Sequence, residues 1–497
     1  MPVTVASARA LARLGFASRR LPPRAMVLLG LFSLLCCNAQ VEARNWAINP
    51  GIALSGTYSD NVAPGIAGAA GADETDFITQ INPSLLAEIN GRRLQANLNY
   101  RMQNIFYANN DDENTTYHQY LARAEAEVLP EHFFIDASSS LTQRYISTNG
   151  VRTNNNLTLT GNRTDRLTAR IRPYWYQPIG SYAEALLDYE RGFVKYDDDN
   201  NVLNLNTEES ILDAASLTIN SLAGARRLSW KIRLREENLI YEDDDFDDQR
   251  FRSASLLLGY EIIPGLSPLA LVGYEDNGYG DKQYRTVPRG SVWAVGFRWQ
   301  PNSRNELEAL AGRRFFGNTY LVNWQQRGRY LTSALTYREE LGGEATSALE
   351  SVSRLIDDPG VSSNSYLGVT GDAFLSKSAE ASVEYKKART TITISPFYEK
   401  RVFENSAQDD SIGGIDGTWE WAFAPRTTFT LELHWDKDDD NDTFTTAGLQ
   451  LERELGKQAT ASIGYSYTRE DSDVKLFSYT ENAVSAQLSY RFGTRAS

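Results

Sequence analysis

The ten residues LQANLNYRMQ (94–103) alternate apolar and polar side chains without a break. The apolar members are Leu94, Ala96, Leu98, Tyr100 and Met102, and the polar members are Gln95, Asn97, Asn99, Arg101 and Gln103. Because successive side chains of a strand point to opposite faces, this period of two predicts a strand with one apolar and one polar face. The same division recurs in LSWKIRLR (228–235) and TFTLELHW (428–435), and about twenty such segments lie between Ile48 and Phe492.

A soluble β-sandwich also alternates apolar and polar residues, so the connections between the segments decide the architecture. Short Gly- or Pro-bearing connections include INGRR (89–93), LPEH (129–132), QPIGS (177–181), QPNSRN (300–305), APRT (424–427) and ELGKQ (454–458). Long connections fall between them, such as SDNVAPGIAGAAGADE, VKYDDDNNVLNLNTEE, YEDDDFDDQ and EDSDVKLFSYTEN. Short periplasmic turns and long extracellular loops are typical of up-and-down outer-membrane barrels.

The sequence therefore predicts an all-β fold: a transmembrane up-and-down antiparallel β-barrel of about 20 strands, with a range of 18 to 22. Counting gives fourteen segments before residue 341 and seven after 378, although a barrel with both ends in the periplasm needs an even number. A weak segment from Tyr366 is a candidate for a further strand. Leu349, Val352, Leu355 and Ile356 lie at helical spacing and predict a short helix near residues 344–357, as a turn-side cap or partial plug.

The N-terminus predicts an export signal. Five arginines precede the apolar run AMVLLGLFSLL (25–35), and a cleavage pattern follows at Val41-x-Ala43. We expect residues 1–43 to be a signal peptide and residues 44–497 to form the barrel, located in the cell outer membrane. Removing 1–43 leaves 45 basic and 63 acidic residues, a net charge of −18, and no cysteine. This balance argues against nucleic acid as a partner and excludes thiolate metal sites.

Acidic residues concentrate in YDDDNN (196–201), YEDDDFDD (241–248) and DKDDDND (436–442). All three belong to long connections, so a barrel would place them on one side as a negatively charged outer rim. The third resembles no EF-hand, because Asn441 and Ala447 stand where Gly and Glu are required. Solubilising charge is the default interpretation, and loose binding of Ca²⁺ or Mg²⁺ beside lipopolysaccharide is the alternative.

An enzyme of barrel fold would carry its catalytic residues at the rim or on the lipid face. His434 alternates with the lipid-facing residues and so points inward, which argues against a barrel phospholipase. It lies two residues from Asp436, so a rim-located hydrolase that polarises water remains a third hypothesis. The sequence contains no Walker-type loop, metal-spaced His pair or nucleophile elbow. We therefore expect no enzyme and no cofactor, and assign no catalytic, cofactor-binding or metal-binding residue.

The stretches INPGIALSGTYSDNVAPG, RTTITISPFYEKR and WEWAFAPRTTFTLEL resemble the PEP-CTERM system-associated outer-membrane β-barrel family. That resemblance implies an outer-membrane location and an association with exopolysaccharide and exosortase sorting, and it supplies no catalytic residues. The last apolar face, which resembles the signal read by the barrel assembly machinery, consists of Val484, Ala486, Leu488, Tyr490 and Phe492.

The expected function is that of a pore, anchor or export and assembly partner associated with exopolysaccharide and PEP-CTERM surface-protein sorting. A passive diffusion porin is the alternative. The expected partners are outer-membrane lipid and lipopolysaccharide, the barrel assembly machinery and exopolysaccharide export components.

Overall fold

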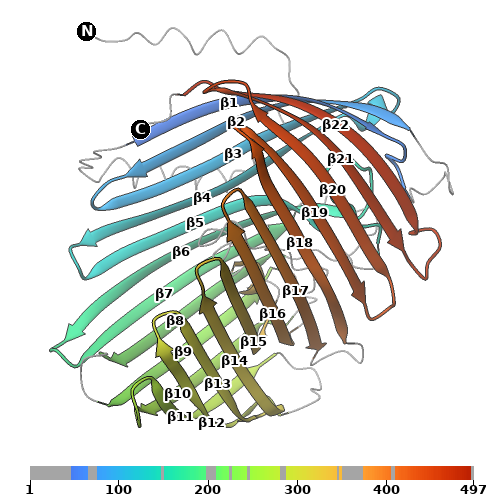
Figure 1. Cartoon of the computed structure of the whole chain (residues 1–497). Coiled ribbons are helices and arrows are strands. Elements are labelled where there is room, and N and C mark those ends of the chain that lie inside the picture. The colour runs from blue at the N-terminus through green and yellow to red at the C-terminus, as the bar shows by residue number, and fades with distance from the viewer. Residues whose placement is uncertain are drawn as a thin grey trace.

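The computed structural model describes residues 46–64, 75–146, 150–196, 209–222, 227–242, 247–279, 287–343, 346–349, 373–403 and 409–493. Within them, twenty-two strands follow one another along the chain and form one sheet (Figure 1). The expected signal peptide, residues 1–43, lies outside the described residues.

The first eleven strands are β1 (Trp46–Ser59), β2 (Asp76–Asn90), β3 (Leu94–Tyr107), β4 (Thr115–Leu129), β5 (Phe133–Tyr145), β6 (Arg163–Ile179), β7 (Ala183–Tyr196), β8 (Ser210–Ser221), β9 (Leu228–Tyr241), β10 (Gln249–Tyr260) and β11 (Leu266–Gly278). The others are β12 (Arg289–Asn302), β13 (Asn305–Arg314), β14 (Gly317–Arg327), β15 (Leu331–Gly342), β16 (Phe374–Lys387), β17 (Thr390–Phe403), β18 (Asp410–Ala424), β19 (Thr427–Asp438), β20 (Thr443–Glu454), β21 (Ala459–Asp471) and β22 (Tyr479–Arg491).

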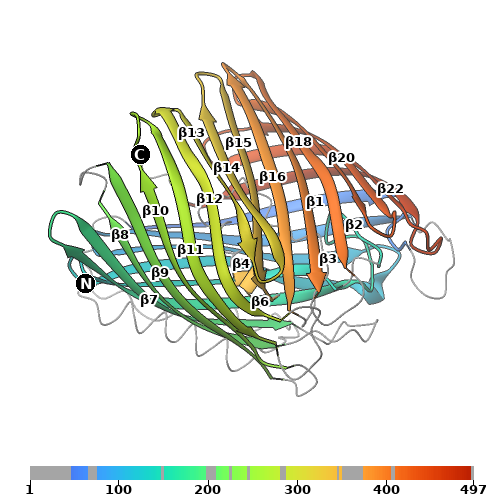
Figure 2. The ribbon, with the colours of Figure 1, turned by 90° about the horizontal axis from the view of Figure 1, so that it is seen from below.

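The sheet closes on itself. Each strand pairs antiparallel with the next, and β22 pairs with β1 from Gly51 opposite Arg491 to Ser59 opposite Ala483. Figure 2 shows the strands forming a continuous curved wall. Closure leaves no free strand edge, so the backbone polar groups of the wall are satisfied without water.

The two ends of the barrel differ as the sequence predicted. β1 begins and β22 ends at the same end, which we call the turn end, where the connections are short. Glu131, Ala388 and Arg426 adopt positive φ angles of 64°, 54° and 61° in these tight turns. The long connections lie at the opposite loop end, although β13 and β14 are joined there by Phe315 and Phe316 alone and β19 and β20 by residues 439–442.

The strand range of 18 to 22 is confirmed, but the count of twenty-one segments is wrong. Fifteen strands end by Gly342 and seven begin at Phe374 or later, so the additional strand lies in the first group, where the two-residue β13–β14 connection breaks the long-loop pattern. Tyr366 lies outside the described residues. Of the helix expected near 344–357, residues 346–349 are helical, and the remainder lies outside the described residues. Among the described residues, a 3₁₀ turn covers Asp111–Glu113.

The two faces of the wall follow the two-residue period. Leu98 stands opposite Ala87, which stands opposite Ile48, and Ile48 is 54% exposed on the outside of the barrel. Asn97 shares the opposite face with Glu88 and therefore points into the lumen.

The outer surface carries an apolar belt bounded by aromatic side chains. Exposed Trp46, Trp299 and Phe492 lie near the turn end, and exposed Tyr58 and Trp435 lie towards the loop end. Such a belt between two aromatic girdles is typical of a barrel wall in contact with lipid. The protein is therefore an outer-membrane β-barrel. No helix in the described part of the chain is long and apolar enough to cross a membrane.

Candidate functional site

The connection between β5 and β6 folds back inside the barrel instead of extending from it. We call its residues 150–162 the inner loop. Its side chains contact lumen-facing residues of β2, β3 and β5 on one side and of β19, β21 and β22 on the other. Since β19 to β22 and β1 to β5 are contiguous in the closed sheet, the inner loop lines one continuous arc of the wall.

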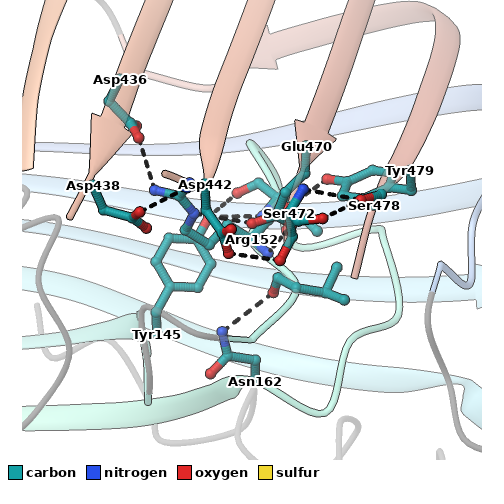
Figure 3. Close-up of polar contacts among 12 residues, drawn as sticks. Tyr145, Arg152, Asn162, Asp436, Asp438, Asp442, Glu470, Ser472, Ser478 and Tyr479 are labelled. Carbon is teal, nitrogen blue, oxygen red and sulfur yellow. Dashed lines mark hydrogen bonds and ion pairs between the residues drawn. The ribbon is translucent and has the colours of Figure 1, made fainter. Parts of the chain in front are cut away.

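Arg152 anchors one side of the inner loop to β19 and β21 (Figure 3). Its Nη1 donates to Asp436 Oδ1 at 2.8 Å, and its Nε donates to Glu470 Oε1 at 3.1 Å. Its backbone N–H donates to the second oxygen of Glu470 at 2.9 Å, and Tyr479 Oη donates to the Arg152 carbonyl. We call this cluster of Arg152, Asp436, Glu470 and Tyr479 the latch.

The charges of the latch are almost entirely removed from water. The side chains of Arg152, Asp436 and Glu470 are 3%, 1% and 1% exposed. Burial alone would lower the pKa of the Arg152 guanidinium, but the charges of Asp436 and Glu470 outweigh it and raise that pKa. Arg152 therefore remains a cation, and it also lies over the Phe444 ring, 5.1 Å from the ring centre.

His434 extends the latch along β19. Its Nε2 lies 2.7 Å from Asp436 Oδ2, and its Nδ1 lies 2.7 Å from Asp416 Oδ1. Two carboxylates therefore hold the two ring nitrogens and favour the imidazolium form. A general base needs a ring nitrogen that can take a proton from water, so this geometry gives no support to the rim-hydrolase hypothesis. His434 points inward, as its alternation predicted.

A second polar anchor joins the inner loop to β22. Thr158 Oγ1 donates to Glu481 Oε2 at 2.9 Å, and Ser59 Oγ donates to Glu481 Oε1 at 2.6 Å. The same loop turns sharply at Asn155, whose side-chain oxygen accepts the N–H groups of Leu157 and Thr158. Asparagine favours such local turns, which explains how the polar run NNNLT folds here.

Apolar contacts fix the other side of the inner loop. Leu157 and Leu159 pack against Val62, Ile78 and Ile105, which are fully buried. The backbone N–H of Leu159 donates to the Val62 carbonyl at 2.7 Å, and Tyr107 Oη donates to the Leu157 carbonyl at 2.7 Å. The inner loop is thus held by charge at β19 and β21 and by apolar packing at β2 and β3.

The short helix of residues 346–349 is a second segment inside the lumen at the loop end. Ala348 and Leu349 belong to a buried cluster with Val194, Leu212 and Leu239, which face inward from β7, β8 and β9. Leu349 lies directly over Gly192, where a Cβ atom would come within 2.2 Å of Leu349 Cδ1. These four residues lie in the lumen at the loop end, so the turn-side position expected for a cap is wrong.

A polar cavity of about 510 Å³ adjoins this helix. Six arginines and six glutamates are among its lining residues, including Arg235, Glu237, Glu275 and Arg314. Arg235 pairs with Glu237 at 2.7 Å and Arg314 pairs with Glu275 at 2.8 Å, so the charges largely cancel. Arg170 and Arg172 also line the lumen, where they pair with carboxylates on neighbouring strands.

The acidic cluster at 436–442 does not form a simple solvated rim. Asp436, Asp438 and Asp442 are buried, while Asp439 and Asp440 are exposed. Asp442 accepts hydrogen bonds from Ser472 Oγ at 2.6 Å and from the Asp473 N–H at 2.8 Å. The period of two along β19 turns Asp436 and Asp438 inward, where the sequence predicted a uniform outer charge. Most of the other two acidic clusters lies outside the described residues.

No group of three or more His, Cys, Asp or Glu side chains is arranged to hold a metal ion within the described ranges. The sequence did not single out the inner loop or Arg152. The signal present in the sequence is the polar stretch ISTNGVRTNNNLTLTGN (146–162), a long connection with a single arginine. Its partners lie 284 and 318 residues away, so no local pattern could identify them.

Comparison with known families gives one match: residues 357–494 match the family model described as surface lipoprotein assembly modifier. No curated protein matches the chain. The matched segment includes β16 to β22, and therefore both acidic partners of Arg152.

Several solved barrels are similar to the chain. The FrpB iron transporter from Neisseria meningitidis (F5-1 variant) is 8% identical, with a TM-score of 0.47, covering 89% of this chain and 82% of the other. A mutant ferric enterobactin receptor, PfeA from Pseudomonas aeruginosa, is 9% identical, with a TM-score of 0.46 and coverage of 89% and 80%. The siderophore receptor PirA from Pseudomonas aeruginosa is 10% identical, with a TM-score of 0.42 and coverage of 90% and 80%. At these TM-scores the likenesses add nothing to the assignment that the barrel itself supports.

Proposed function

We propose that this protein acts in the assembly of surface lipoproteins, as an outer-membrane barrel whose inner loop is held in place by the latch until cargo or a partner releases it. The family-model match over residues 357–494 supports the cargo class. The observation that carries the gating part of the proposal is the buried pairing of Arg152 with Asp436 and Glu470, both on strands of the matched segment.

Desolvation of the latch favours a gated barrel over a passive porin. Charges that select ions in a diffusion pore must face the water through which the ions pass. Arg152 and its two partners are at most 3% exposed, so they attract each other and contribute little to a field in the lumen. Buried ion pairs add little net stability, but they specify a single arrangement that a competing charged group can replace.

The surface-lipoprotein proposal is tested by comparing intact cells with and without the protein. We expect surface biotinylation of the deletion strain to label fewer lipoproteins, with their total amounts unchanged in whole-cell extracts. The wild-type gene and an Arg469→Ala variant should both restore labelling, because Arg469 and Asp471 form an exposed outward pair. Unchanged lipoprotein labelling in the deletion strain would contradict the proposal.

The passive diffusion porin is the second candidate, and the paired arginines and glutamates of the lumen favour it. Single-channel recording of the purified protein separates the two functions. A latched barrel should conduct little and conduct more in an Arg152→Ala variant. Steady conductance in the wild type that Arg152→Ala leaves unchanged would favour the porin.

The association with exopolysaccharide and PEP-CTERM sorting stays a prediction, since the family model that matches is a different one. This association predicts that the deletion strain carries less surface polysaccharide than the wild type. Staining of intact cells measures the amount of surface polysaccharide. Loss of surface polysaccharide with normal lipoprotein display would favour that association over the proposal.

A further inference from the structure

The outer wall contains a groove that the latch and lumen do not use. Five outward side chains on neighbouring strands stand in one cross-strand row: Leu187, Leu217, Leu234, Ala254 and Tyr274. This row belongs to the apolar belt, since Leu187, Leu234 and Tyr274 are exposed on the lipid side.

The belt ends abruptly one row nearer the loop end. That next row, across the same five strands and β12, consists of Tyr189, Ala215, Glu236, Arg252, Asp276 and Arg289. A further step brings Arg191, Asp213 and Arg250. Because charge is costly within the hydrocarbon and tolerated at its edge, the boundary between these rows marks the outer-leaflet interface.

The groove crosses this boundary. It has a volume of about 380 Å³ and is lined by the small side chains of Ala215 and Ala254 together with the larger Leu187, Leu234 and Tyr274. Arg252 and Asp276 stand at its charged end. The groove thus combines an apolar trough inside the membrane with a charged mouth at the surface.

Two further arginines do not line the groove but stand in the charged rows beside it, and neither has a carboxylate partner among the described residues. Arg191 pairs with Asp213 at 3.3 Å, and Arg252 pairs with Glu236 at 2.6 Å. Arg250 and Arg289 are exposed and form no ion pair with a described residue, although Asp276 stands opposite Arg289 in register. Arginine binds phosphate well because its planar donors match the phosphate oxygens.

We propose that this groove binds lipid A, the phosphorylated glycolipid anchor of lipopolysaccharide, with an acyl chain in the trough and a phosphate between Arg250 and Arg289. The occupant of a trough open to the hydrocarbon must be apolar there, and unpaired arginines at the outer-leaflet interface select an anionic headgroup. The site is independent of the lipoprotein proposal, because no latch residue contributes to it.

The experiment measures lipid A retained by the full barrel after purification in detergent, quantified by mass spectrometry per mole of protein. Arg250→Ala combined with Arg289→Ala should reduce retention about tenfold, and Ala254→Phe, which fills the trough, should do so without removing a charge. Arg469→Ala, on the far strand β21, is the matched control and should retain the wild-type amount.

Reconstitution with lipid A or with phosphatidylglycerol separates the two sources of lipid phosphate. Retention of lipid A alone, lost in the double arginine variant, supports the site. Equal retention of both lipids, or equal retention of lipid A in wild type and variants, would overturn it. The arginines are exposed, so their variants are expected to fold and remain decisive even if Ala254→Phe does not assemble.

Discussion

Two of the described segments that enter the lumen at the loop end differ in the contacts that hold them. The inner loop combines apolar packing of Leu157 and Leu159 with Arg152, whose charge is buried between Asp436 and Glu470. The helix at 346–349 depends on Ala348 and Leu349, which pack against apolar residues of the inner wall. Thr346 adds one hydrogen bond, from its Oγ1 to Glu237 Oε1 at 2.6 Å.

Apolar packing and a buried ion pair respond differently when the segment that they hold moves. Apolar packing weakens gradually as contact area is lost, because its free energy follows the apolar area removed from water. A buried ion pair behaves differently: it contributes little net stability when intact, but breaking it leaves a charge without a partner. The latch can therefore act as a switch with two states, one with the ion pair intact and one with it broken. The helix is better suited to occupy a fixed position in the lumen.

The largest effect is expected from Arg152→Ala. Removing the cation leaves Glu470 buried without its counter-ion, at a cost of about 3–5 kcal/mol. Asp436 keeps its contact with His434, so the free-energy loss should concentrate on β21. Hydrogen exchange followed by mass spectrometry should show loss of amide protection across residues 150–162.

Arg469→Ala is the control for that experiment. It removes an ion pair from the outward side of the same strand, with side chains 55% and 60% exposed, and such pairs contribute about 0–1 kcal/mol. Protection of the inner loop should stay at the wild-type level. Similar exchange in the two variants would show that the latch does not hold the loop.

Most of the wall could be predicted from the sequence, and the latch could not. The alternation of apolar and polar residues around Leu98 is a property of the local sequence. Where a strand borders lipid, this alternation correctly distinguishes its lipid-facing side from its lumen-facing side. The two-residue connection at Phe315 and Phe316 departs from the pattern of long loop-end connections, so the boundary between β13 and β14 was not recognised in the sequence. The partners of Arg152 depend on closure of the whole barrel, since the inner loop meets β19 only once β22 pairs with β1.

The second effect compares charge placed in lipid with charge placed in the lumen. Leu98→Arg puts a cation on the lipid face at a cost of about 2–4 kcal/mol near the middle of the bilayer. Asn97→Arg puts the same charge one residue away on the wet inner face, where arginines are common. Heat-modifiable mobility on gels should show impaired assembly for the first variant and normal assembly for the second. Equal assembly of both would contradict the assignment of the two faces.

The third effect tests the apolar side of the comparison. Leu349→Ala removes most of the side chain that covers Gly192, and buried Leu-to-Ala changes cost about 2–5 kcal/mol. We expect a cost at the lower end of this range, because the helix at 346–349 borders the polar cavity and can relax after the substitution. Hydrogen exchange should rise in residues 346–349 and stay unchanged in the inner loop. A coupled rise in both segments would show that they move as one unit.

The smallest effect concerns the acidic run at 243–248, which the latch does not include. Changing Asp243, Asp244, Asp245, Asp247 and Asp248 to Asn removes five negative charges from the connection between β9 and β10 without altering Asp436 or Glu470. Exposed charges act through a potential that salt screens over about 10 Å at 0.1 M, so the change should be visible at low salt and fade at high salt. The experiment needs an open channel, which the Arg152→Ala background should provide. Reversal potentials in asymmetric KCl should then shift towards weaker cation preference.

The paired inward arginines Arg170 and Arg172 are common to both proteins, so their contribution to the reversal potential cancels in the comparison. An unshifted reversal potential at low salt would leave these five acids as solubilising charge, in contrast to the acids of the latch.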